Sequence, residues 1–131
     1  MQILLPPGWR RPGGYSNGVA TEGRLVFIAG LLGWDENSEF HSDDFITQSE
    51  QALDNTVTVL AEAGAKPEHV VRMTWYITDK REYHARGREL GEVYRAIMGR
   101  HYPAMAMVEV SGLMEDRAKV EIETTAVLPN D

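Results

Sequence analysis

Five short segments of the chain have the hydrophobic pattern of β-strands. The clearest covers residues 70–78, where Val71, Met73 and Trp75 alternate with polar side chains. Such alternation places the apolar residues on one face of a sheet, and it predicts a core position for Trp75. The nearly continuous apolar run at 24–29 is instead typical of a buried strand. The five predicted strands are 15–20, 24–29, 70–78, 103–110 and 118–128.

Two stretches repeat their apolar residues at helical spacing. The first follows Ser42, a residue type that caps helix N-termini, and it ends before Gly64, which suits the position just past a helix. The second begins at Asp79, which forms an acidic capping box with Glu82, and it closes at Gly99. The first stripe comprises Phe45, Ser49, Ala52, Leu53, Thr56, Val57, Leu60 and Ala63, and the second Tyr83, Gly87, Leu90, Tyr94 and Ile97.

The predicted order of elements is therefore β-β-α-β-α-β-β, in one domain covering residues 1–131. The short polar connection at 112–117 leads us to expect that the last two strands are antiparallel neighbours. Two amphipathic helices can cover one face of such a sheet, which predicts a two-layer α+β fold. The opposite face, with Arg72, Thr74 and Tyr76, must then contact water or another subunit.

Composition and charge narrow the classes of function. A formal net charge of −7 disfavours nucleic acid as a partner, because phosphate binding needs clustered Lys and Arg. The chain contains no cysteine, and its four histidines are scattered, so we expect no metal site. The longest apolar stretch is too short to cross a membrane, and the first residues lack the pattern of a signal peptide. We therefore expect a cytoplasmic protein without a membrane partner.

Three polar residues are candidates for chemistry. Glu121 and Glu123 share one face of the last strand. Both carboxylates are solvated on an exposed sheet face, or one lies in a cleft where burial raises its pKa enough to exchange protons with a water. Tyr15 follows a glycine turn, and its ring either packs against the fold or forms hydrogen bonds in the same cleft.

Three apolar residues are candidates for the wall of such a cleft. Trp34 belongs to a polar loop at 30–41, where an indole can line a pocket or an interface. Met105 and Met107 share one face of a strand. Their flexible thioethers either fill an irregular part of the core or form an adaptable apolar wall.

Several motifs follow one another over residues 6–128 in a fixed order. They include Gly13-Gly14-Tyr15-Ser16, Leu25-Val26-Phe27-Ile28-Ala29-Gly30, Gln51-Ala52-Leu53-Asp54-Asn55, Val70-Val71-Arg72-Met73-Thr74, Tyr102-Pro103-Ala104 and Val120-Glu121-Ile122-Glu123. Their order and spacing resemble the RidA/YjgF (reactive intermediate deaminase) family. This resemblance implies a chorismate-mutase-like, YjgF-like fold and a homotrimer with a central barrel and small-molecule clefts between subunits. The family's characterised deaminases hydrolyse enamines or imines to ketones and ammonia without a cofactor.

The resemblance also implies roles for individual positions. In the family's deaminases a strand arginine binds the substrate carboxylate, and a carboxylate that corresponds to Glu121 orients or activates the water. A tyrosine that corresponds to Tyr15 lines the cleft. Backbone groups near Gly30 and the residue that matches Met107 line it as well.

The sequence departs from this pattern at the anchor for the carboxylate. The family's Pro-Ala-Arg-Ser reads Pro103-Ala104-Met105-Ala106 here, and its Gly-Gln reads Gly30-Leu31. Methionine cannot replace the two parallel hydrogen bonds of an arginine–carboxylate pair. We therefore expect a cofactor-free hydrolase of an enamine or imine that carries an apolar or aromatic group instead of the usual α-carboxylate. Glu121 and Tyr15 would be its catalytic residues, and its substrate would contact Gly30, Leu31, Trp34, Met105, Ala106 and Met107.

A second hypothesis follows from the same loss of arginine. The protein would be a non-catalytic trimer that binds a small molecule or serves as an accessory protein in a catabolic pathway. It would bind its ligand without turnover and would tolerate Glu121→Gln. Endoribonuclease activity, which is sometimes attached to the family, is disfavoured by the acidic chain.

Overall fold

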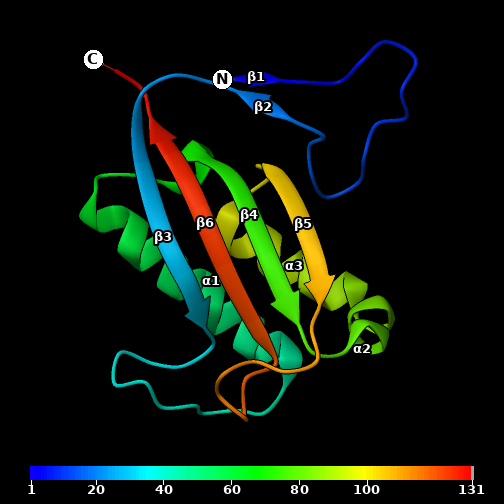
Figure 1. The fold of residues 1–131 in the computed structure, drawn as a ribbon, viewed down its shortest axis with the longest axis vertical. Coiled ribbons are helices and arrows are strands. Elements are labelled where there is room, and N and C mark those ends of the chain that lie inside the picture. The colour runs from blue at the N-terminus through cyan, green and yellow to red at the C-terminus, as the bar shows by residue number, and fades with distance from the viewer. Residues whose placement is uncertain (131) are drawn as a thin grey trace.

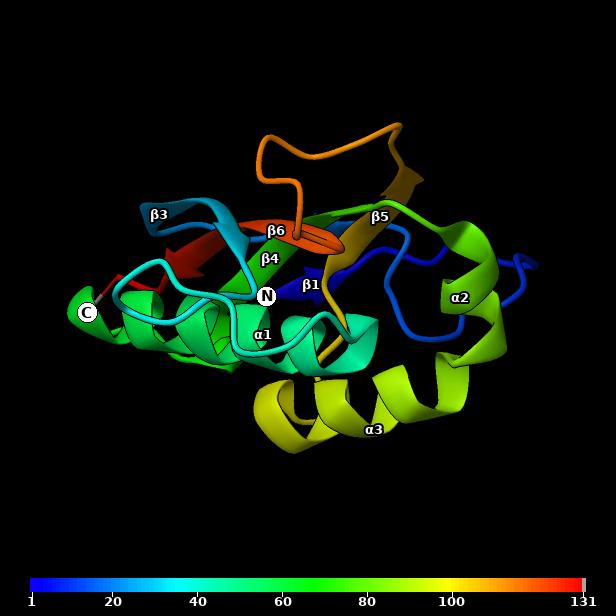
Figure 2. The same ribbon diagram turned by 90° about the horizontal axis from the view of Figure 1, so that it is seen from below.

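The computed structural model describes residues 1–130 and shows a four-stranded sheet packed against a layer of helices (Figure 1). The sheet has the order β3-β6-β4-β5. Helices α1 and α3 lie on the same side of it, and a single hydrophobic core fills the space between (Figure 2). This confirms the predicted two-layer α+β architecture. The sheet comprises β3 (Arg24–Leu32), β4 (Val70–Ile77), β5 (Ala104–Glu109) and β6 (Val120–Leu128), and the helices are α1 (Phe45–Glu62), η1 (Pro67–His69), α2 (Lys80–Ala85) and α3 (Gly87–Met98).

The N-terminal part of the chain forms a separate two-stranded ribbon. Strand β1 (Gln2–Ile3) pairs antiparallel with β2 (Val19–Ala20). The sequence pattern predicted a strand over 15–20 and missed β1, because two-residue strands are too short to show a period. Within that segment, Ser16 instead forms an isolated bridge with Ala104 at the start of β5.

The expected pairing of the last two strands is wrong. Strand β5 runs parallel to β4, whereas β6 lies between β3 and β4 and is antiparallel to both. The chain leaves β4, passes through α2 and α3, and returns as β5, which is the crossover that parallel neighbours require. The short connection after β5 therefore leads past β4 rather than into a hairpin.

Burial along β4 and β3 corrects two further expectations. Val70, rather than Val71, is fully buried beside Met73 and Trp75, because a register shift between Val70 and Arg72 changes the alternation. Strand β3 is an edge strand that continues to Leu32. It is not buried on both faces, since Leu25 and Phe27 are 59% and 74% exposed on this chain.

The first helix begins at Phe45, where its apolar stripe begins, but its cap lies two residues later than predicted. Asp44, rather than Ser42, is the N-cap, and its carboxylate accepts a hydrogen bond from the Thr47 amide at 3.0 Å. The Ser42 hydroxyl accepts one from the Asp44 amide instead. At the other end, Gly64 has a φ of +74°, so the predicted terminating glycine is confirmed.

The second predicted helix is divided into α2 and α3 at Arg86. Asp79 caps it as predicted and accepts a hydrogen bond from the Arg81 amide at 2.9 Å. The Arg86 backbone leaves helical geometry, and its guanidinium bridges Glu89 and the α1 cap Asp44. This positive charge holds the pKa of both carboxyl groups below its usual range. Gly99, with a φ of +70°, ends α3 as predicted.

Within residues 1–130, no helix combines the length and the apolar composition that crossing a bilayer requires.

Candidate functional site

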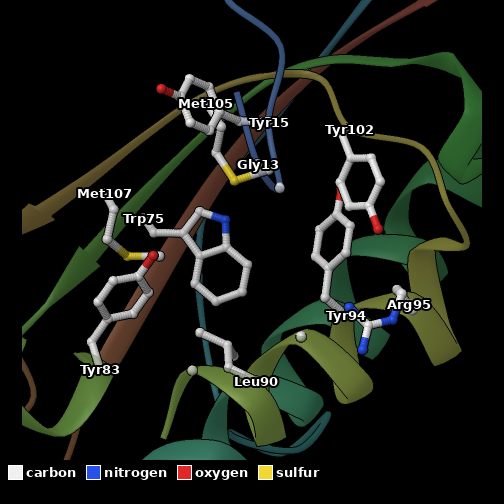
Figure 3. A pocket seen from close by; sticks show the side chains of 13 residues that line it. Gly13, Tyr15, Trp75, Tyr83, Leu90, Tyr94, Arg95, Tyr102, Met105 and Met107 are labelled. Carbon is white, nitrogen blue, oxygen red and sulfur yellow. The ribbon is translucent and has the colours of Figure 1, made fainter. Parts of the chain in front are cut away.

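A cavity of about 590 Å³ lies between α3, strands β4 and β5, and the loop that precedes Tyr15 (Figure 3). We call it the Met105 pocket. This volume is within the range of pockets that bind small molecules. The pocket is lined by Gly13, Gly14, Tyr15, Trp75, Tyr83, Gly87, Leu90, Gly91, Tyr94, Arg95, Tyr102, Met105 and Met107.

Two strands supply the inner wall of the pocket. In the parallel register of β4 and β5, Met105 lies opposite Met73 and Met107 lies opposite Trp75. The Trp75 side chain is 1% exposed, and Figure 3 shows its ring between the two lining methionines and α3. Trp75 therefore belongs to the core, as predicted, and also contacts the cavity.

One face of α3 supplies the opposite wall. Gly87, Leu90, Gly91 and Tyr94 follow the spacing of a single helix face. A glycine within a helix costs up to about 1 kcal/mol relative to alanine. Here Gly87 and Gly91 line the pocket without contributing side chains, so this face of α3 leaves room for the cavity.

Two tyrosines form the end of the pocket near the C-terminus of α3. The rings of Tyr94 and Tyr102 stack with centroids 5.7 Å apart and planes inclined by 13°. The Tyr94 hydroxyl donates a hydrogen bond to the His101 carbonyl at 2.6 Å. Burial raises the pKa of Tyr94 above its usual value, so this phenol is neutral. The pair is therefore a fixed aromatic surface.

Tyr15 is held beside the start of β5 by the residue that follows it. The Ser16 amide donates to the Pro103 carbonyl at 3.0 Å, and the Ser16 hydroxyl donates to the Tyr102 carbonyl. Tyr15 itself is 43% exposed, and Figure 3 shows its ring next to Met105. The structure thus brings together three of the predicted site residues: Tyr15, Met105 and Met107.

Glu121 lies on the other face of the sheet. Its neighbours Val120 and Ile122 point into the core and are fully buried, so Glu121 points away from the helices. A Cβ atom on Gly30 would be 2.6 Å from its carboxylate. Gly30 belongs to a register shift in β3, between Ile28 and Leu31. The structure therefore places Glu121 against Gly30, and it separates Glu121 from Tyr15 within one chain.

The second glutamate of this strand has a partner of its own. The Tyr76 hydroxyl donates a hydrogen bond to Glu123 at 2.8 Å, on the face that the helices leave uncovered. This hydrogen bond raises the pKa of Tyr76. Glu123 is thus bound to Tyr76, whereas no side chain of residues 1–130 donates a hydrogen bond to Glu121.

The remaining predicted contacts lie outside the Met105 pocket. Leu31, near the end of β3, packs against the hydrophobic core. Trp34 packs against Phe40 with ring centroids 5.5 Å apart, and its carbonyl accepts a hydrogen bond from Asn55. Ala106 alternates with Met105 and therefore faces the other side of the sheet.

Sequence reasoning missed the aromatic and cationic part of the pocket. Tyr83 and Tyr94 stand out in the sequence only as members of an amphipathic helical stripe, and Arg95 lies outside that stripe. The signal that could have found this wall is the pair Gly87 and Gly91, since glycines four residues apart leave a helix face open. Across residues 1–130, no three acidic or histidine side chains gather closely enough to hold a metal ion.

Comparison with known proteins shows the family. The family model described as "Endoribonuclease L-PSP" matches residues 10–128. A RutC family protein of Pyrococcus abyssi is 33% identical over 87% of this chain and 86% of its own length. A 2-iminobutanoate/2-iminopropanoate deaminase of Salmonella typhimurium is 30% identical over 88% of each chain.

A solved structure gives the same result for the fold. A protein of unknown function from Yersinia pestis, of the conserved Rid protein family, superposes with a TM-score of 0.86 and 29% identity, over 97% of this chain and 98% of its own. The order of motifs, the fold and these matches agree. The chain belongs to the endoribonuclease L-PSP family, which includes the RidA/YjgF proteins.

Proposed function

We propose that this protein hydrolyses an enamine or imine that carries an apolar or aromatic group, and that this group binds in the Met105 pocket. One observation carries the proposal: Met105 and Met107 face a cavity whose other lining residues, apart from Arg95, are aromatic, leucine or glycine. Some relatives are named as deaminases of the small imino acids 2-iminobutanoate and 2-iminopropanoate. A thioether wall favours apolar groups over the carboxylate of such substrates.

The proposed active site needs a second copy of the chain. Glu121 and the Met105 pocket lie on opposite faces of one sheet, so one chain cannot place both against the same substrate. Leu25 and Phe27 on the uncovered face support association, because exposed apolar side chains that cluster on a sheet face mark interaction surfaces. In the homotrimer that we propose, Glu121 of one copy completes the pocket of another.

The chemistry requires no cofactor. Glu121 accepts a proton from a water as the water oxygen adds to the carbon of the C=N bond. The carboxylic acid so formed returns this proton to the nitrogen, which gives a carbinolamine. Glu121 then transfers the proton of the carbinolamine hydroxyl to the nitrogen, and the C–N bond breaks to release ammonia and leave a carbonyl group. Tyr15 lies at the edge of the pocket and positions the substrate. Positioned acid–base groups of this kind typically contribute a factor of roughly 10²–10⁴ to the rate.

A substrate comparison tests the proposal. We expect the wild-type protein to accelerate ammonia release from a freshly generated benzylic imine, produced by oxidation of benzylamine. The acceleration for 2-iminopropanoate, produced by oxidation of alanine, should be at least about tenfold smaller. Met105 stands where the family resemblance implies the strand arginine that pairs with the substrate carboxylate. A preference for 2-iminopropanoate, or no acceleration with either imine, would overturn the proposal.

A non-catalytic function remains a second candidate, and one observation favours it. Glu121 and Tyr15 are separated within the chain, so a trimer that does not bring them together would keep the pocket and lack the water-activating carboxylate. Such a protein would bind apolar ligands without releasing ammonia, and Glu121→Gln would leave its ligand affinity unchanged.

A further inference from the structure

The Met105 pocket has one charged side chain among its described lining residues, and that side chain is Arg95. All its other lining residues are aromatic, aliphatic, methionine or glycine. The protein as a whole carries a formal net charge of −7. A lone cation in an apolar wall of an acidic protein favours a ligand with one negative group.

Among residues 1–130, the Arg95 guanidinium has no carboxylate partner. Ion pairs within residues 1–130 use other arginines: Arg86 binds Asp44 and Glu89, and Arg117 binds Asp43. Arg95 belongs to none of these pairs, although Glu92 lies one turn before it on the same helix. Its five N–H donors are therefore available to a ligand.

The local geometry directs Arg95 along the pocket wall. A Cβ atom on Gly91 would be 3.0 Å from Nη1 of Arg95 and 3.6 Å from Nη2. The guanidinium thus lies across the glycine that precedes it by one helical turn, and Gly91 itself lines the pocket. Long side chains in helices lean toward the N-terminus, which brings this charge back over the open face of α3.

A second donor lies beside the same cavity, on a residue of the strand wall. Within the described residues, Nε1 of Trp75 is buried and has no hydrogen-bond acceptor. Figure 3 shows it on the edge of the indole nearest Met105, across the pocket from Arg95. A buried donor without a partner is unfavourable, so an acceptor on a ligand would be stabilised there. The flexible Met105 side chain beside it can move aside for a ligand acceptor.

We infer that the ligand of the Met105 pocket is an aromatic or apolar molecule with one anionic group, and that Arg95 binds this group and determines specificity. The inference rests on the proposed function, which places the apolar part of the ligand against Met105 and Met107. It places the anion at the α3 wall, on a different element from the strand arginine that the family resemblance implies. The rings of Trp75, Tyr94 and Tyr102 then flank the body of the ligand.

Equilibrium binding of two matched probes tests the role of Arg95. Phenylacetate and phenylacetamide have nearly the same shape, and only the first is charged. We expect calorimetric titration to show that the wild-type protein binds phenylacetate about tenfold more tightly, as a charge-assisted hydrogen bond implies. Arg95→Gln should abolish this preference and leave the affinity for phenylacetamide within about twofold. Arg88→Gln is the matched control, because Arg88, like Arg95, is an exposed arginine of α3 and lies outside the pocket lining.

Each result has a definite consequence. Four results would overturn the role of Arg95. They are equal affinity of the wild-type protein for the two probes, a preference that persists in Arg95→Gln, loss of the preference in Arg88→Gln, and failure of both probes to bind. Because these titrations involve no turnover, they separate the two proposals. If the protein hydrolyses the benzylic imine but binds phenylacetate no more tightly than phenylacetamide, the Arg95 inference alone is overturned. If it prefers phenylacetate through Arg95 but releases no ammonia from the imine, the proposed hydrolysis alone is overturned.

Discussion

Glu121→Ala is expected to slow imine hydrolysis by about 100-fold or more, because it removes the carboxylate that takes the proton from water. Glu121 is a strand residue between the fully buried Val120 and Ile122, so its position is fixed by the sheet. Its carboxylate lies against Gly30, at the register shift of β3. Ammonia release from the benzylic imine, measured at saturating substrate, gives the rate.

The matched control for Glu121 is its neighbour on the same face of the same strand. Glu123 carries the same charge and binds the Tyr76 hydroxyl at 2.8 Å. We expect Glu123→Ala to retain most of the activity. Equal rates in Glu121→Ala and the wild-type protein, or an equal loss in both variants, would show that Glu121 has no specific part in the reaction.

Trp75→Ala is expected to lower the free energy of unfolding by about 3–5 kcal/mol, the usual cost of removing a buried aromatic side chain. The Trp75 ring is 1% exposed, and it packs between the sheet and α3 while also lining the Met105 pocket. Its loss would enlarge the cavity and remove part of the wall at once. Urea denaturation of the variant, compared with the wild-type protein at one protein concentration, measures the change.

A second tryptophan provides the comparison for this variant. Trp34 lies in the loop after β3 and is only half-buried beside Phe40. Trp34→Ala should therefore cost clearly less than Trp75→Ala. If the two substitutions cost the same, the assignment of Trp75 to the core would be wrong.

The elements of the fold were predictable where a local signal decides them. Alternation from Met73 to Ile77 and the terminating residues Gly64 and Gly99 were sufficient to identify β4, α1 and the helical segment before Gly99, but not its division into α2 and α3. The order of the strands in the sheet could not be predicted, because the return of the chain beside β4 depends on packing over the whole sheet. The register shift near Val70 moved the buried position by one residue for the same reason, since no local pattern marks it.

The candidate site was predictable only in part. Periodicity placed Met105 and Met107 on one face, and the structure adds Tyr15 through the hydrogen bonds of Ser16. The wall formed by Gly91 and Arg95 was missed, because a helical stripe read alone does not show which part of it faces a cavity. Nor could the sequence show that Glu121 and this pocket occupy opposite faces of one sheet.

The most direct test of the central claim, that an apolar ligand binds between β5 and α3, is methionine methyl NMR. In protein labelled with ¹³C at the methionine methyl groups, saturation with phenylacetate should shift the signals of Met105 and Met107. The signal of Met114, which is 94% exposed and remote from the pocket lining, should not move. Unchanged Met105 and Met107 signals at saturation, or shifts of Met114 as large as theirs, would contradict the claim.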